Sequence, residues 1–334
     1  MTAYPLTSPK RPWTSRRPRT ERPALGFWRI LLLAGLCWVI SAPSPSSTAE
    51  ERTTLRTIWR GESGGFVITW TTADIRAARV EQPHHAVFAA ASLAQEGFAA
   101  FRDSLPASGR EAEPHHCVYE RQFRLMSVIG SWLSFEDAVY AFCEGWAHPA
   151  VETRFTSIDL TKPGPVEYAP SAGLPPIDVD VAGLGKAAKL TDLFPESTIL
   201  QALLDDPVLK QAWPVADPSK IPRSLGELSQ RLADRPVEVG DCLFRFPADF
   251  LTRFAFHHRA NGRVAVRLGL PPKLAPCRTY HAQLGLALAI PDALKTPLAL
   301  AASGRAGFLM RDREKIAGNQ AATVAFGIGK FAPR

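Results

Sequence analysis

Two short segments have the residue spacing of motifs that carry chemistry. Gly61 to Gly65 fits G-x-S-x-G, in which a sharp turn from a strand into a helix exposes a nucleophilic serine. The residues that follow, Phe66 to Trp70, favour a strand, so we interpret the segment as a glycine-rich turn between two strands. Gly183 to Ala188 fits the dinucleotide pattern G-x-G-x-x-A. Pro195 ends any helix too early to present its N-terminus to a pyrophosphate, so we expect no cofactor.

Histidines and acidic residues give no metal or catalytic pattern. Six of the eight histidines form the pairs His84-His85, His115-His116 and His257-His258. Adjacent residues on a strand point to opposite faces, so such a pair is poorly placed to chelate one metal. Neither H-E-x-x-H nor C-x-x-C occurs, and we expect no metal site. No carboxylate pair suited to glycoside hydrolysis stands out by its spacing, so no catalytic residue is predicted.

The first 49 residues have the layout of a secretory signal. A basic region precedes the apolar run Ile30–Ile40, and small residues fill Ser41–Ala49. Cleavage after Ala49 fits the preference for small residues, and the alternative is an uncleaved N-terminal membrane anchor. We therefore expect a periplasmic or cell-surface protein, either secreted or anchored. The expected division is 1–49 as signal or anchor, 50–310 as an extracytoplasmic domain of one or two subdomains, and 311–334 as a loose tail.

The basic charge of the chain belongs to this leader. The formal net charge is +7, but the first 49 residues hold seven of the 39 basic residues and only one of the 32 acidic ones. The remainder is nearly neutral, which argues against general binding to nucleic acid. Contact with a membrane is expected only through the N-terminal segment.

Four cysteines follow the leader: Cys117, Cys143, Cys242 and Cys277. An even number in an exported chain indicates two disulfides, and four cysteines allow three connectivities. We favour Cys117–Cys143 and Cys242–Cys277, because each pair brackets a segment that has the pattern of a hairpin. The alternative is four buried free thiols.

Local patterns predict strands grouped in hairpins, with helices between them. Asn261-Gly262 lies between two alternating segments and is the strongest turn signal, typical of a type I′ hairpin. Ser224 and Glu227 form a capping box. The other predicted strands are Gly65–Thr72, Cys117–Ile129, Phe135–Cys143, Arg154–Leu160 and Leu284–Ile290; the other predicted helices are Ala86–Leu105, one from Ser197 or Thr198 to Leu204, one from Pro207, and Asp292–Ala302. This order favours an α+β fold with mainly antiparallel sheet built of hairpins with interspersed helices.

Two segments in the middle of the chain carry a resemblance to a known family. Gly145-Trp146-Ala147-His148-Pro149 leads through Thr153 to Asp159-Leu160, and Leu190-Thr191-Asp192-Leu193-Phe194 precedes a helix. These segments resemble the extracytoplasmic domain of RsiV-type anti-sigma factors, and the resemblance covers about half of the chain. The chain departs from that family in the long connection Thr161–Lys189. It also departs in residues 1–24, which are too rich in proline and basic residues to form a helical sigma-binding region.

The resemblance implies a non-enzymatic domain that binds a protein of the cell envelope. The motif-matched candidates for binding are Gly145, Ala147, His148, Pro149, Asp159 and Asp192. A structural role is the alternative for each: a tight turn with His148 bonded to a neighbouring strand or a carboxylate, Asp159 accepting backbone N–H groups, and Asp192 capping a helix. The implied partner is a lysozyme-like or peptidoglycan-active protein. A cell-wall hydrolase acting on glycan or peptide and a purely structural envelope protein are the other hypotheses.

Overall fold

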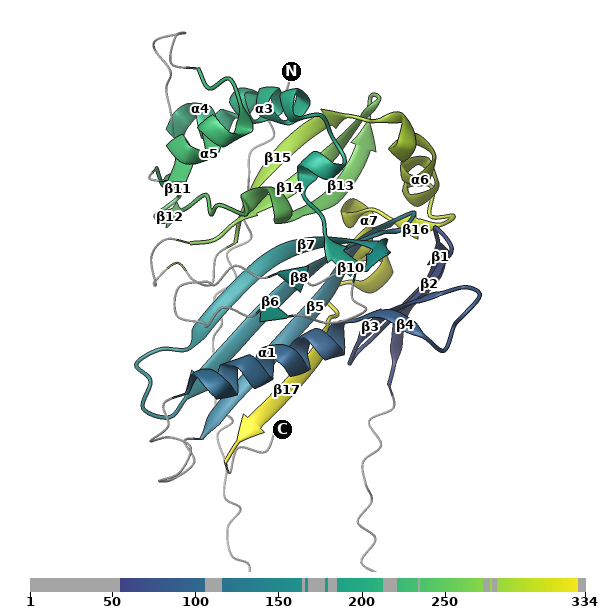
Figure 1. Cartoon of the computed structure of the whole chain (residues 1–334), viewed down its shortest axis with the longest axis vertical. Helices are drawn as coiled ribbons and strands as arrows, with labels where there is room; N and C mark the ends of the chain where they lie inside the picture. The colour runs from purple at the N-terminus through teal and green to yellow at the C-terminus, as the bar shows by residue number, and fades with distance from the viewer. Residues whose placement is uncertain are drawn as a thin grey trace, which may run out of the picture. The chain divides into compact units, whose positions relative to one another are not determined.

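Antiparallel hairpins form most of the described structure, a computed structural model of the chain (Figure 1). It describes residues 55–105, 116–163, 166–167, 178–179, 185–212, 221–233, 235–272, 277 and 281–329. The predicted leader, residues 1–49, lies outside them. Within the described residues no helix combines the length and apolar character needed to cross a bilayer.

The first sheet is a four-stranded antiparallel meander. Its strands, paired in chain order, are β1 (Thr57–Ser63), β2 (Phe66–Thr71), β3 (Ile75–Arg79) and β4 (Ala86–Ala89). Alternate residues of β2 are buried, as its sequence pattern predicts. Gly64 and Gly65 have positive φ angles and form the turn between β1 and β2, so the interpretation of the G-x-S-x-G segment as a turn is confirmed. Ser63 is buried, and its hydroxyl donates a hydrogen bond to the Ala306 carbonyl at 3.3 Å.

The second sheet is built on three long strands. These are β5 (Cys117–Ile129), β6 (Trp132–Cys143) and β7 (Ala150–Pro163), and the short β10 (Gly185–Ala187) pairs with β7. The other side of β5 pairs with two strands from the end of the chain, β16 (Gly307–Phe308) and β17 (Ala322–Ile328). Nearby, β8 (Val166–Glu167) pairs with β9 (Asp178–Val179), and β9 contacts the helix that covers the sheet.

The prediction of a loose tail from residue 311 is wrong. Residues 310–317 form helix α7 (Met310–Ala317), and β17 pairs with β5 from Ala322–Phe123 to Ile328–Cys117. Apolar side chains alternate along β17 from Ala322 to Ile328, but no local pattern indicates that this strand pairs with β5. Residues 330–334 lie outside the described part of the chain.

Helix α1 (Ala90–Ser104) covers one face of the second sheet (Figure 1). Leu93 and Ala94 of α1 pack with Phe66 and Trp70 of the first sheet and with Phe135 of the second in one apolar cluster. The predicted helix Ala86–Leu105 is therefore too long at its start, since its first four residues are β4. Full burial of a phenylalanine contributes about 2–3 kcal/mol, so this cluster stabilises the contact between the two sheets.

The third sheet consists of β13 (Phe254–Ala260), β14 (Arg263–Leu270) and β15 (Ala282–Ala289), in that order. Asn261 and Gly262 have φ angles of 50° and 71°, which confirms the predicted two-residue turn. One face is apolar and packs on helices α3 (Glu196–Asp205), α5 (Leu225–Ala233) and α6 (Asp292–Ala302). The remaining elements are η1 (Leu190–Asp192), α4 (Pro207–Ala212), β11 (Val237–Val239), β12 (Cys242–Phe244) and η3 (Phe250–Thr252).

Both favoured disulfides are present. Cys117 and Cys143 have Cα atoms 4.0 Å apart on directly paired positions of β5 and β6, and those of Cys242 and Cys277 are 5.7 Å apart. Two disulfides indicate an oxidising, extracytoplasmic environment. The α+β fold with antiparallel hairpins and interspersed helices is confirmed.

Candidate functional site

The six motif-matched residues do not form one site. Gly145, Ala147 and His148 are exposed in the loop before β7, and Pro149 is half-buried there. Asp159 lies nine residues beyond the start of β7 at Ala150, a distance of roughly 30 Å along an extended strand. Asp192 follows β10, which pairs with the Asp159 end of β7. The motif therefore marks two separate places in the fold.

The expected bond from His148 to a neighbouring strand is absent among the described residues. The imidazole is exposed, and no hydrogen bond joins it to any part of the chain that the structure describes. The loop before β7 explains the difference: Gly145 takes a φ of 88°, and Gly145, Ala147 and His148 are all exposed to solvent. The bracing role proposed for His148 is therefore wrong in this structure.

Asp159 and Asp192 have structural partners. Asp159 Oδ1 accepts hydrogen bonds from Ser131 Oγ at 3.1 Å, Thr161 N at 3.1 Å and Thr161 Oγ1 at 2.7 Å. These bonds tie the β5–β6 turn to the end of β7. Asp192 Oδ2 accepts a bond from Lys189 N at 2.9 Å and closes the 3-10 turn η1, whereas α3 begins four residues later at Glu196.

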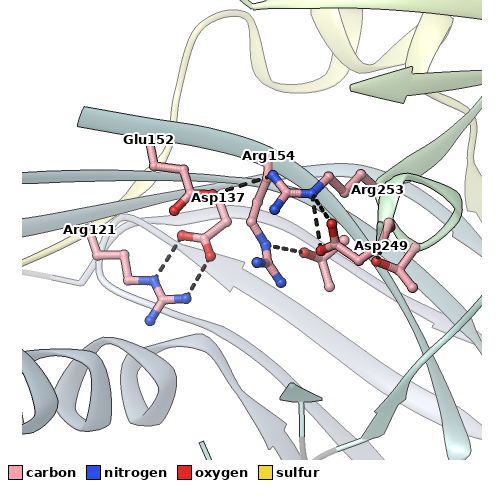
Figure 2. Close-up of polar contacts among 8 residues, drawn as sticks. Arg121, Asp137, Glu152, Arg154, Asp249 and Arg253 are labelled. Atoms are coloured by element: carbon pink, nitrogen blue, oxygen red, sulfur yellow. Dashed lines mark hydrogen bonds and ion pairs between the residues drawn. The ribbon is translucent and has the colours of Figure 1, made fainter. Parts of the chain in front are cut away.

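A network of buried charged side chains lies on the second sheet, where that sheet contacts α1 and the segment before β13 (Figure 2). Arg121 is fully buried and donates to both oxygens of Asp137, at 2.8 and 2.6 Å. Its third bond, at 2.6 Å, reaches the Leu93 carbonyl in α1. The pair therefore joins β5, β6 and α1 through one guanidinium. Such a bidentate, desolvated ion pair is strong because both charged groups form their hydrogen bonds in a fixed geometry.

A second part of the network joins the second and third sheets. Arg253, the residue before β13, donates to Glu152 of β7 at 3.3 Å and to Asp249 at 3.1 Å. Arg154 of β7 donates to Thr156 at 3.3 Å. Strand register places Arg121 and Glu152 opposite Val139, and Asp137 opposite Arg154, so these charges share one face of the sheet.

This network is suited to holding the fold together. Its three guanidiniums balance its three carboxylates, and Asp137 is sealed from solvent. Both carboxylate oxygens of Asp137 accept hydrogen bonds from Arg121. Burial raises the pKa of the neighbouring Tyr119 hydroxyl, which keeps it protonated. The carboxylates of Asp137, Glu152 and Asp249 are each engaged by an arginine.

Sequence reasoning missed these residues, although a signal was present. Arg121 lies between Tyr119 and Phe123 in the inward phase of one strand, and Asp137 lies between Phe135 and Val139 in the inward phase of the next. When the two strands of a hairpin carry opposite charges at inward positions that are otherwise apolar, a buried ion pair is indicated. The contact between Arg253 and Glu152 had no such signal, because the two residues are 101 positions apart.

His257 and His258 do not face opposite ways, although they are adjacent on a strand. A β-bulge lies between Phe256 and His258, and it places an extra residue opposite Ala265. Both imidazoles consequently lie together, with Nδ1 atoms 2.7 Å apart. Even so, no cluster of three or more potential metal ligands occurs among the described residues.

A shallow, open pocket of about 340 Å³ lies between α3 and the third sheet. Its helix side is lined by Ser197, Thr198, Gln201, Ala202 and Asp205, and its sheet side by Arg263, Ala287 and Ala289. β15 is the last strand of its sheet, so one row of its backbone groups points away from β14. We call this feature the α3–β15 groove. Its small side chains leave room for a main chain to approach.

Comparison with known proteins identifies no relative: no protein family, no curated protein and no solved structure matches this chain.

Proposed function

We propose that this protein is a non-enzymatic binding module of the cell envelope, which docks a lysozyme-like protein in the α3–β15 groove. The motif resemblance in Gly145–Pro149 and Leu190–Phe194 suggests the class of partner. The two disulfides support an extracytoplasmic place of action.

The observation that carries the proposal is the groove beside an edge strand. An edge strand offers unpaired N–H and C=O groups, and an extended segment of a partner can pair with them. Ala287 and Ala289 would let that segment lie close to β15, and the polar side chains of α3 could fix its register. The network of buried charges also supports a binding module over a hydrolase. Its carboxylates are engaged by arginine and are poorly suited to cleaving glycan.

Binding to a purified lysozyme can be measured by isothermal titration calorimetry. Gln201→Trp would fill the groove from an exposed helix position, and we expect it to weaken binding at least tenfold. Lys295→Trp makes a comparable change on exposed α6 and is the matched control, expected to bind as the wild type does. Equal losses in both variants, or no binding by the wild type to a panel of lysozymes, would contradict the proposal. Release of reducing ends from purified peptidoglycan would favour the hydrolase instead.

A further inference from the structure

The face of the third sheet opposite α3, α5 and α6 carries a cluster of basic side chains. His257 and His258 come from the bulge in β13, Arg267 from β14, and Arg311 from α7, which packs on β13. His257, His258 and Arg267 are half-buried and Arg311 is exposed, so solvent reaches the cluster. We call these four residues the His–Arg cluster.

The glycine opposite Arg267 on β15 leaves room for the Arg267 side chain. Its register partner on β15 is Gly285, and a Cβ added to Gly285 would lie 2.7 Å from Arg267 Nη1. The guanidinium therefore occupies the space that a side chain on β15 would fill. Glycine weakens a strand interior, so its presence here fits a requirement for close approach. Within the described residues, no carboxylate forms a salt bridge with Arg267.

The charges around the cluster favour an anion over a cation. The ionisable groups facing the imidazoles are Arg267 from β14 and Arg311 and Asp312 from α7, while β15 has no ionisable residue. Asp312 lies 3.6 Å from its neighbour Arg311 and offsets only one of the two guanidiniums. Burial and these positive charges lower the pKa of His257 to about 4 and also lower the pKa of His258. A metal ion would meet the same repulsion.

The imidazole pair can present two outward donors. A bond between the two Nδ1 atoms requires one ring to donate and the other to accept. If the donating ring takes up one proton at Nε2, that bond stays intact and both rings carry an N–H at Nε2. Two imidazole N–H groups and two guanidiniums supply the charge-assisted hydrogen bonds that a tetrahedral oxyanion needs.

We propose that His257, His258, Arg267 and Arg311 form a binding site for a phosphate group. Binding of the dianion is coupled to uptake of up to one proton by the imidazole pair. The site is separate from the docking of a protein in the α3–β15 groove, and each can be tested without the other.

The purified protein can be titrated with inorganic phosphate at pH 6.5 and constant ionic strength, while the imidazole Cε1–H signals are followed by NMR. Phosphate should shift the signals of His257 and His258 and saturate them at one site per chain. Acetate and chloride at the same ionic strength should not. Calorimetry with sulfate, which does not titrate near neutral pH, in two buffers of different ionisation enthalpy should report the proton uptake.

Gly285→Ala is the decisive variant. Its methyl group must displace the Arg267 guanidinium, which is the far end of a flexible side chain, so the fold should persist while phosphate affinity falls. Arg267→Met should weaken binding about tenfold or more, as expected for loss of a charged hydrogen bond. Arg305→Met removes one exposed charge elsewhere and should leave binding unchanged. Equal binding of acetate, full affinity in folded Gly285→Ala, or a response of the imidazoles to Zn²⁺ alone would overturn the proposal.

Discussion

At the scale of single residues, the buried pair Arg121–Asp137 gives the sharpest prediction. Asp137→Asn would leave the Arg121 guanidinium buried without its counter-charge, and we expect a loss of about 3–5 kcal/mol in the free energy of unfolding. Equilibrium urea unfolding measures this loss. Lys295→Ala breaks the exposed pair with Asp292 and should change stability by less than about 1 kcal/mol. A loss below about 1 kcal/mol for Asp137→Asn would mean that the pair is not a brace.

For His148, unlike Asp137, we expect substitution to leave stability unchanged. Its imidazole is exposed and has no hydrogen bond in the described part of the chain, so His148→Ala should leave the melting temperature unchanged. Thermal unfolding followed by circular dichroism is the measurement. A drop of several degrees would show that the imidazole contacts a part of the chain that the structure does not describe.

At the scale of elements, the Asn261–Gly262 turn sets the register of the third sheet. Gly262 has a φ of 71°, and a Cβ at such an angle costs about 1–2 kcal/mol. Gly262→Ala should therefore lower the free energy of unfolding by about that amount, measured by urea denaturation. Asn261→Asp keeps a residue that suits the turn and should cost much less. Equal stability of Gly262→Ala and the wild type would mean that the hairpin tolerates another turn type.

Elements with local signals could be predicted, and those that depend on distant partners could not. The β5–β6 hairpin and the Asn261–Gly262 turn follow from alternation and turn chemistry within about 30 residues. The return of β17 to β5 has no local signal. The candidate site divides in the same way: the His257-His258 dipeptide is visible in the sequence, but the bulge that puts both rings on one face depends on pairing with β14.

At the scale of the whole molecule, partly buried histidines make stability depend on pH. His281 lies against Phe155 with ring centroids 4.7 Å apart, and burial lowers its pKa, as it does for His257 and His258. In the unfolded chain histidine titrates near about 6.5. As the pH falls below that value, the unfolded chain gains protons that the native state does not bind, so the free energy of unfolding falls.

We therefore expect a lower urea midpoint at pH 5.5 than at pH 7. His281→Leu removes one of the groups responsible and should reduce the difference between the two midpoints. The exposed His84→Leu should keep the wild-type difference. A midpoint that rises on acidification would contradict the burial of these imidazoles.

The pairing of β17 with β5 has a consequence for how the protein is made. Phe123 of β5 leaves the ribosome about 200 residues before its partner Ala322. At synthesis rates of about 5–20 residues per second, one edge of β5 stays open for roughly 10–40 seconds. An unpaired edge of that length is a template for aggregation, and contacts so distant in sequence form slowly. The nascent chain is thus vulnerable until β17 is complete, and a variant that ends before Ala322 would keep that edge of β5 open.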